Sequence, residues 1–216
     1  MASNPDQYRL SEADHQAIFE QDIRPDLFAG AKPANQPVAV IFGGQSSEHS
    51  ISCLSAASVL AAVDRSRYRV QAVGITRTGH WYRVSDDPAD WVRNGSVLPG
   101  VTPVGEEINL ADVSADVVFP VLHGPFGEDG TIQGALEIQG LPYVGSGVLA
   151  SALTMDKQAT KMMLAAADLP VGKSVAVSDA DWLRHREHVL AQLHDLSWPV
   201  FVKPARAGSS VGITKV

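Results

Sequence analysis

The sequence predicts an α/β fold built on a parallel sheet, followed by the beginning of a second, α+β lobe. The short run 38–42 is continuously apolar and the run 116–122 is apolar after Asp116, as expected of strands that are buried on both faces. Each run leads through a glycine-rich loop into a helical segment, at 51–63 and at 131–139. Strand, loop and helix in repetition are typical of a Rossmann-like domain.

The other elements follow from the same kinds of pattern. A strand at 69–76 is joined by a turn at 77–80 to a strand at 81–84, which predicts a hairpin. Residues 86–105 have little periodicity and are expected to form a loop with a short helix. The later elements are expected to be a short strand at 141–144, helices within 148–167, a strand at 173–177, an amphipathic helix at 181–196, a strand at 200–203 and a strand at the end of the chain.

Three units are expected along the chain. Residues 1–36 are polar and proline-containing, with one short helix near 11–21, and are interpreted as an N-terminal extension. Residues 37–150 form the Rossmann-like domain, and the patterning becomes helix-rich near its end. Residues 151–216 are expected to be the first part of the second lobe, which is predicted to be truncated.

Composition excludes several classes of protein. The chain has 216 residues and a formal charge of −7 with no cluster of Lys and Arg, which argues against nucleic-acid binding. Cys53 is the only cysteine, so a disulfide framework and a thiolate metal site are excluded. No apolar run is long enough to cross a membrane, and the polar N-terminus does not resemble a signal peptide. A cytoplasmic location is therefore expected.

The loop GGQSSEHS connects the first buried strand to its helix, where open α/β sheets bind ligands. Glu48 is expected in or just before the first helical turn. Its carboxylate either complements the helix dipole or faces the crevice and binds a ligand's ammonium group. The loop also resembles a G-x-S-x-G nucleophile elbow, but Glu48 occupies the position of the second glycine, which disfavours an acyl hydrolase.

A second glycine-rich loop, HGPFGEDG, follows the strand at 116–122. His123 begins this loop and is expected to point into the same crevice as Glu48, either as a ligand contact or as a hydrogen-bonded structural residue. Glu128 and Asp129 precede a helix, so they are interpreted as N-terminal capping residues.

Two further patterns are not interpreted as sites. Gly172-Lys173-Ser174 resembles the end of a P-loop, but Ala167 stands where the first glycine is needed, and a helix rather than a strand precedes it. His185 and His188 are three residues apart on a predicted helix without an accompanying carboxylate pattern, so they are assigned to a solvated face.

The last segment of the chain, WPVFVKPARAGSSVGITKV, contains the most informative pattern. Lys203 ends an apolar run, where a lysine is costly to desolvate unless an anion meets it. The loop at 207–210 follows, and its backbone N–H groups can converge on an anion. Lys203 is interpreted as a phosphate contact, with an edge-strand charge as the alternative. Lys157 lies in a helical region, where a solvent-exposed lysine is the default.

These segments, in this order, resemble one enzyme family. GGQSSEHSIS, FPVLHGPFGEDGTIQGALEIQGLPYVGSGVLASALTMDK and WPVFVKPARAGSSVG are similar to bacterial D-alanine–D-alanine ligases, which are ATP-grasp enzymes of peptidoglycan precursor synthesis. The resemblance covers residues 37–216 and implies a pre-ATP-grasp domain followed by the start of an ATP-grasp lobe. It implies that ATP phosphorylates the carboxylate of one D-alanine and that the amine of a second D-alanine attacks the acylphosphate.

The resemblance also implies roles for individual residues. Glu48 and Ser209 would be catalytic and substrate-binding. Glu48 would bind the ammonium group of the first D-alanine, and Ser209 would help to position the catalytic network with Glu48. His123 would contact the carboxylate side of that substrate. The implied ATP-binding residues are Lys157, Lys203, Gly208, Ser209, Ser210 and Val211.

Some expectations concern departures from the family pattern. Ala205 and Ala207 stand where the family often has serine and glutamate, which is expected to tune loop motion. The ligands of Mg²⁺, the oxyanion arginine and the loop that selects the second substrate are expected beyond Val216, so the 216-residue chain alone is predicted to be inactive. The family implies a homodimer. The alternatives are a ligase that uses D-lactate or D-serine, and a non-catalytic nucleotide-binding module.

Overall fold

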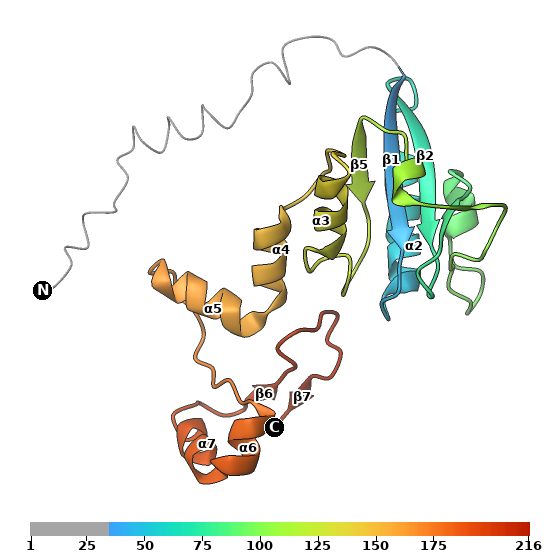
Figure 1. Cartoon of the computed structure of the whole chain (residues 1–216). Coiled ribbons are helices and arrows are strands. Elements are labelled where there is room, and N and C mark those ends of the chain that lie inside the picture. The colour runs from blue at the N-terminus through green and yellow to red at the C-terminus, as the bar shows by residue number, and fades with distance from the viewer. Residues whose placement is uncertain (1–34) are drawn as a thin grey trace, which may run out of the picture.

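The computed structural model describes residues 35–216. The helix expected near 11–21 lies outside this part of the chain. A five-stranded sheet with its helices forms one part of the molecule, and a group of helices with a two-stranded hairpin forms another (Figure 1). Within residues 35–216, no helix is both long and apolar enough to cross a membrane.

The large sheet has a parallel centre and an antiparallel edge. β1 (Gln36–Gly43) pairs in parallel with both β2 (Tyr68–Ile75) and β5 (Val117–Pro120). β3 (Trp81–Arg83) pairs antiparallel with β2, and the two-residue strand β4 (Glu107–Ile108) extends this edge. The order is β4-β3-β2-β1-β5. The α/β fold class and the hairpin after β2 are therefore confirmed, and the expected parallel sheet is in fact mixed.

The two faces of β1 explain why its sequence is apolar throughout. Val40 and Phe42 face a core that includes α2 (His49–Ala62), whereas Ala39 and Ile41 face a core that includes α3 (Thr131–Ile138). All four side chains are fully buried. Because helices cover both faces, the strand cannot show the polar and apolar alternation of a one-sided sheet.

Cys53 lies in the core between the sheet and α2. Burial is the main reason that the pKa of its thiol is raised to about 11. The thiol is therefore neutral at physiological pH and behaves as a small apolar side chain.

The chain leaves the sheet through α4 (Val148–Met155) and α5 (Lys157–Ala166), as Figure 1 shows. Two short helices, α6 (Asp179–Arg184) and α7 (Arg186–Leu193), precede an antiparallel pair of two-residue strands. This pair consists of β6 (Phe201–Val202) and β7 (Thr214–Lys215). The loop between them returns towards the large sheet (Figure 1).

Three expected elements differ from the structure. Residues 173–177 form no strand, because no neighbouring strand among the described residues supplies hydrogen-bond partners for them. The helix expected at 181–196 is divided into α6 and α7 at His185, whose φ of −134° and ψ of 37° are not helical. The strand expected at 141–144 is reduced to one bridge between Tyr143 and Val118.

The other expected elements are present with small shifts in their ends. The loop at 86–105 contains one 3₁₀ turn at Pro88–Trp91, as expected of a segment with a short helix. A second 3₁₀ turn at Leu110–Asp112 was not expected, and a reciprocal capping box between Asn109 and Asp112 closes it.

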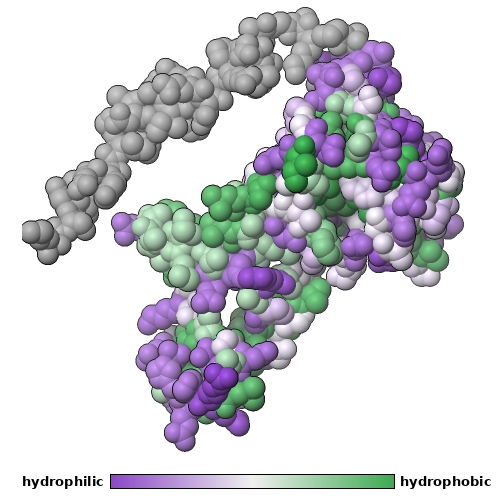
Figure 2. Space-filling view, in the orientation of Figure 1, coloured by the Kyte–Doolittle hydropathy of each residue, from purple (hydrophilic) through white to green (hydrophobic). Residues whose placement is uncertain are grey.

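Apolar residues also remain on the surface of the helices outside the sheet. Figure 2 shows hydrophobic surface over α4 and α5. Leu149 is 81% exposed and Met162 is 65% exposed. A contiguous apolar surface on connecting helices is more typical of a contact surface than of free solvent.

Phe42 gives a direct test of the packing between the sheet and its helices. Its ring is fully buried and meets Trp91 edge-on, with 4.7 Å between the ring centroids. We expect Phe42→Ala to lower the free energy of unfolding by about 3–5 kcal/mol, because it leaves a cavity in the core. Urea unfolding would measure the loss. Val97→Ala is the matched control, since Val97 is 68% exposed, and equal effects of the two variants would contradict the packing described here.

Candidate functional site

Glu48 lies at the N-cap position of α2, and its side chain makes no capping hydrogen bond. Its carboxylate instead accepts a hydrogen bond from the hydroxyl of Ser209, a residue 161 positions later in the chain. The side chain is therefore used for a contact across the molecule rather than for closing its own helix. Glu48 therefore does not cap its own helix, and the expectation that its carboxylate binds a ligand in a crevice stays a prediction.

Two serine hydroxyls hold the start of α2 against the sheet. The Oγ of Ser52 accepts a hydrogen bond from the N–H of Gly43 at 2.8 Å and donates to the carbonyl of Val121 at 2.6 Å. The Oγ of Ser46 donates to the carbonyl of His123 at 2.7 Å and accepts from the N–H of Glu48 at 3.1 Å. The loops after β1 and β5 are therefore joined directly to each other.

The chain path between β1 and α2 also requires glycine. Gly43 has a φ of +90°, and a Cβ there would lie 2.3 Å from the carbonyl oxygen of Ile75. No side chain fits at that distance, so β1 can turn beside β2 only with glycine at this position.

His123 lies beside the same cluster and has two partners of its own. Its Nε2 is 2.9 Å from the Oγ of Ser55, and its Nδ1 is 3.6 Å from a carboxylate oxygen of Glu128. The side chain is about one-third exposed, so it is held in place and still accessible. These contacts support the structural interpretation of His123 and leave room for a ligand contact.

Glu128 and Asp129 stabilise the HGPFGEDG loop from within. Glu128 accepts a hydrogen bond from the N–H of Gly124. Asp129 accepts from the N–H groups of Phe126 and Thr131, and Thr131 begins α3. Burial, the largest influence, would raise the pKa of Asp129, but the hydrogen bonds together outweigh it and lower that pKa. The N-cap residue of α3 is Gly130, which has no side chain, so neither Glu128 nor Asp129 is the N-cap residue expected from the sequence. Asp129 instead accepts from the first N–H of the helix, and Glu128 closes the loop.

The third component of the site is the loop between β6 and β7. A Cβ on Gly124 would lie 2.7 Å from Oε2 of Glu48, and a Cβ on Gly208 would lie 3.5 Å from the same atom. The carboxylate therefore lies between two glycines from distant segments. Because glycine has no side chain, both backbones can approach the carboxylate closely.

The backbone of this loop is strained at two serines. Ser209 has a φ of +45° and Ser210 a φ of +60°, both in the left-handed region. Such conformations cost about 1–2 kcal/mol for each L-residue other than glycine. Strained backbone is concentrated at binding and catalytic sites, where the surrounding structure holds it in place.

Lys157 is tied to the same loop. It is the first residue of α5, and its backbone N–H donates to the carbonyl of Ala205 at 3.0 Å. Its Nζ donates to the carbonyl of Ala207 at 2.5 Å. Beside it, Arg206 pairs with Asp156, with 2.8 Å between Nε and Oδ2. The structure thus places Lys157 next to Gly208 and Ser209, as a phosphate contact would require.

Lys203 is not brought into this cluster. It follows β6 and is exposed, and its Nζ lies 5.8 Å from the centroid of the Phe201 ring. Phe201 and Val202 are themselves 56% and 58% exposed, because β6 pairs only with β7. The expectation that Lys203 ends a buried apolar run is therefore wrong for this structure. Its charge is hydrated here rather than desolvated.

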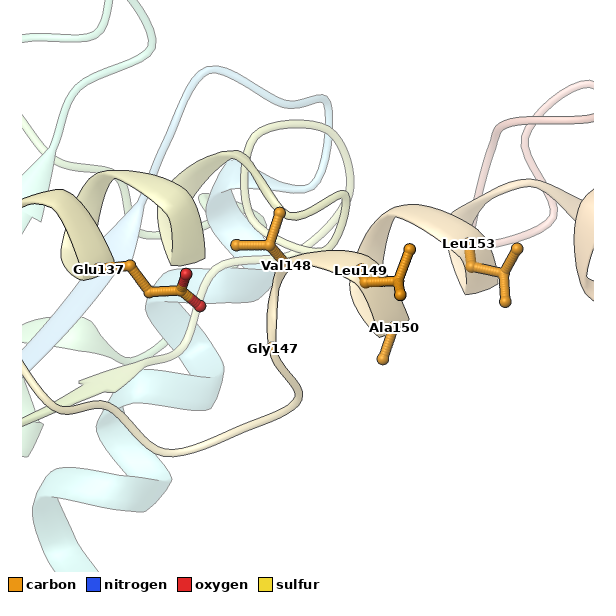
Figure 3. Close-up of a pocket in the computed structure, with 6 residues that line it drawn as sticks. All are labelled: Glu137, Gly147, Val148, Leu149, Ala150 and Leu153. Atoms are coloured by element: carbon orange, nitrogen blue, oxygen red, sulfur yellow. The ribbon is translucent and has the colours of Figure 1, made fainter.

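A shallow hollow lies away from these residues, at the junction of α3 and α4. Figure 3 shows Leu149, Ala150 and Leu153 along α4, with Glu137 on the neighbouring helix. The lining is almost entirely apolar, and the carboxylate of Glu137 already accepts a hydrogen bond from the hydroxyl of Tyr143. This hollow lacks the polar groups of the Glu48 cluster, which remains the candidate site.

Several residues of the site have no counterpart among the sequence-based expectations. Ser46, Ser52 and His49 are buried polar residues that join separate segments. The sequence does contain a signal for them, namely polar residues near the start of a buried helix. Buried polar side chains need hydrogen-bond partners. Which partners they have depends on the fold and could not be predicted from the local sequence.

The described residues do not form a metal site. Among residues 35–216, no group of three or more His, Cys, Asp or Glu side chains is placed to hold a metal ion.

Comparisons with known proteins identify the family of this chain. Residues 37–146 match the family model described as the D-ala D-ala ligase N-terminus, and residues 163–216 match the one described as the D-ala D-ala ligase C-terminus. The chain belongs to the D-alanine–D-alanine ligase family. The two matches also agree with the resemblance found in the sequence motifs.

Individual members of the ligase family are similar along most of this chain. It is 49% identical over 205 residues to the D-alanine–D-alanine ligase of Arthrobacter sp. (strain FB24), a match that covers 86% of this chain and 53% of that protein. It is 50% identical over 201 residues to that of Kineococcus radiotolerans, covering 83% and 53%. The chain therefore spans about half the length of the curated relatives it matches.

Solved structures of the family have the same fold. The D-alanine–D-alanine ligase from Coxiella burnetii matches with a TM-score of 0.68 and 33% identity, covering 85% of this chain and 55% of that one. The VanG D-Ala:D-Ser ligase from Enterococcus faecalis matches with a TM-score of 0.66 and 37% identity, covering 84% and 55%. These matches confirm the predicted fold class.

The bridge made by Ser52 can be tested by stability. Ser52→Ala removes a fully buried hydroxyl and leaves the N–H of Gly43 and the carbonyl of Val121 without their partner. We expect a loss of about 1–3 kcal/mol in the free energy of unfolding. Ser47→Ala is the control, because Ser47 is exposed in the same segment. Denaturant unfolding of both variants measures the difference, and a neutral Ser52→Ala would refute the bridge.

Proposed function

We propose that this chain provides the binding surface for the first D-alanine, and part of the ATP-binding surface, of an enzyme that joins two D-alanines. The product, D-alanyl-D-alanine, is used in peptidoglycan precursor synthesis. The observation that carries the proposal is the contact between Glu48 and Ser209, which brings the loop after β1 to the strained Gly/Ser loop. Family membership supports the same reaction.

Within this proposal each residue has one task. Glu48 binds the ammonium group of the first D-alanine, and Ser209 orients the Glu48 carboxylate through its hydroxyl. His123 contacts the carboxylate side of the substrate from the loop after β5. Fixed charges and hydrogen-bond donors around a substrate lower the cost of bringing two anions together.

The proposed nucleotide site is formed by the loop at 208–211 and two lysines. Gly208, Ser209 and Ser210 offer backbone N–H groups, and Lys157 already lies against the loop. The N–H of Val211 donates to the carbonyl of Gly208 at 3.0 Å, so Val211 would contribute by closing the loop. Lys203 would join them by moving its exposed ammonium group. ATP, when bound, supplies the phosphoryl group that activates a carboxylate. We also propose that the two domains comprise residues 37–150 and 151–216. The protein would form a homodimer and would be located in the cytoplasm.

A related specificity has one observation in its favour. The D-Ala:D-Ser ligase is among the structural matches, with 37% identity. The D-alanine–D-alanine ligases of Arthrobacter and Kineococcus are more similar, at 49% and 50%. The ordinary dipeptide is therefore the better-supported product.

Turnover separates an enzyme from a nucleotide-binding module. In the protein's complete natural form, phosphate release from ATP should depend on D-alanine and should yield the dipeptide. Measuring phosphate and dipeptide together tests this. Nucleotide binding without D-alanine-dependent phosphate release would show a binding module instead.

Glu48→Gln tests the ammonium site in the same protein. The change keeps the shape of the side chain and removes its charge, so we expect the D-alanine affinity of the first site to fall about 10- to 100-fold. Nucleotide affinity should change little. Glu137→Gln is the matched control, because Glu137 is exposed and lies outside the cluster. Titration of D-alanine at saturating ATP gives the comparison, and identical curves for the two variants would exclude Glu48 from the site.

Lys203→Ala tests whether this exposed lysine reaches a phosphate. Losing a charged hydrogen bond should weaken nucleotide binding by about 1.5–3 kcal/mol. Lys173→Ala serves as the control, because Lys173 is an exposed lysine of the same part of the chain. Calorimetric titration with a non-hydrolysable ATP analogue provides the affinities. An unchanged affinity would remove Lys203 from the nucleotide site.

A further inference from the structure

His49 follows Glu48 directly and has no role in the function proposed above. It is fully buried, and both of its ring nitrogens have hydrogen-bond partners. Nδ1 lies 2.7 Å from the carbonyl oxygen of Gly44, and Nε2 lies 2.9 Å from the backbone nitrogen of Val101. One side chain thus links the loop before Glu48 to a segment 52 residues away.

These partners determine the protonation of the ring. The backbone N–H of Val101 can only donate, so Nε2 must be unprotonated and accept. The carbonyl of Gly44 can only accept, so Nδ1 must carry the proton and donate. The imidazole is therefore neutral and held as a single tautomer. A protonated ring could not accept from Val101.

Two glycines lie close to the ring of His49. A Cβ on Gly43 would lie 3.1 Å from Cε1 of His49, and a Cβ on Gly100 would lie 3.4 Å from Nε2. The ring therefore occupies a slot between two glycines, one at the end of β1 and one beside Val101. Because close-packed contacts transmit displacements, the ring couples the position of one segment to that of the other.

The electrostatic environment also favours the neutral ring. Burial lowers the pKa of His49 most, the carbonyl of Gly44 opposes this, and the positive charge of Arg77 lowers it further. Arg77 comes from the turn after β2 and donates to the hydroxyl of Ser50. Cys53, one helical turn along α2, is neutral because its thiol pKa is about 11. The segment 98–103 contributes no titratable side chain.

We propose that His49 is a positioning residue for Glu48: its neutral ring fixes the 44–48 loop against Val101 and so sets where the Glu48 carboxylate lies. The inference deepens the proposed function and rests on it. Gly44 begins this loop and Glu48 ends it, so a ring anchored at Gly44 O from position 49 closes the loop at both ends. Ser46 anchors the middle of the loop to His123. The segment at 98–101 thereby becomes part of the support for the D-alanine site.

Three substitutions at this position separate the two hydrogen bonds. His49→Phe keeps a ring and loses both bonds. His49→Asn can still donate to Gly44, and His49→Gln can still accept from Val101. In the protein's complete natural form, we expect His49→Phe to lower D-alanine affinity at least tenfold while nucleotide affinity changes less than twofold. His49→Asn and His49→Gln should each restore part of the loss.

A purely structural role predicts a different result. His49→Phe would then lower the unfolding temperature without separating D-alanine affinity from nucleotide affinity. Equal loss of both affinities, or a loss of stability with D-alanine affinity unchanged, overturns the proposal. Val189→Ala provides a comparison, because Val189 is buried in α7, outside the cluster, and should lower stability without this selective effect.

A second measurement does not require ligand binding. The folded pKa of His49 lies below the usual 6.5, so its stabilising contribution is complete above about pH 6.5 and is lost as pH falls through the folded pKa. Nitrogen NMR of the imidazole should show only the Nδ1–H tautomer at pH 7.5. As the ring titrates, the amide signals of Val101 and of residues 46–48 should shift together. The same signals should not follow this titration in His49→Phe.

The two measurements distinguish the failure of this inference from failure of the proposed function. If the unsubstituted protein binds no D-alanine, the proposed function is wrong. The NMR titration then shows by itself whether His49 fixes the position of the 44–48 loop. If D-alanine binds but the amide signals of residues 46–48 do not shift as His49 titrates, the positioning role is refuted and the proposed function stands.

Discussion

The arrangement of the site depends on the two hydrogen bonds made by the hydroxyl of Ser52. It accepts a hydrogen bond from the end of β1 and donates one to the segment that follows β5, so a residue of α2 joins two neighbouring strand ends. Parallel strands bring their carboxyl ends to one edge of a sheet, but they do not by themselves fix the loops that follow. Ser46 extends the same connection to His123. The two glycine-rich loops are consequently one surface.

That surface is completed from the other end of the chain. The loop between β6 and β7 holds two serines in the left-handed region and presents a hydroxyl to the Glu48 carboxylate. Lys157 holds the carbonyl of Ala207 and therefore connects the start of α5 to the same loop. A carboxylate, a lysine and a strained glycine-containing loop thus lie together although they come from three separate parts of the sequence. Under the proposed function, the carboxylate would bind the ammonium group of the substrate and the lysine would bind an anionic group.

Local patterns predicted the parts of the fold whose burial is strongest. The continuous apolar runs around Val40 and Val118 could be assigned because strands covered on both faces have no polar alternation. The segment at 173–177 also ends in apolar residues but has no partner strand among those described, and strand pairing is not a local property. Glu48 and Ser209 could be found through motifs, whereas the partners of His49 could not, because Val101 lies in a segment without periodicity. The exposed state of Lys203 likewise depends on what covers β6, which its own sequence does not encode.

The buried sulfur atom of the core has a practical consequence for experiments on this molecule. Cys53 is the chain's sole cysteine, and its thiol is both enclosed and protonated at neutral pH. Alkylating reagents attack the thiolate, so the native chain resists them. If Cys53 is nevertheless alkylated, α2 must have moved away from the sheet and exposed the thiol. A reactive cysteine introduced on the surface would therefore be the sole labelling position, and a fluorescent probe could be attached there without first removing the natural residue.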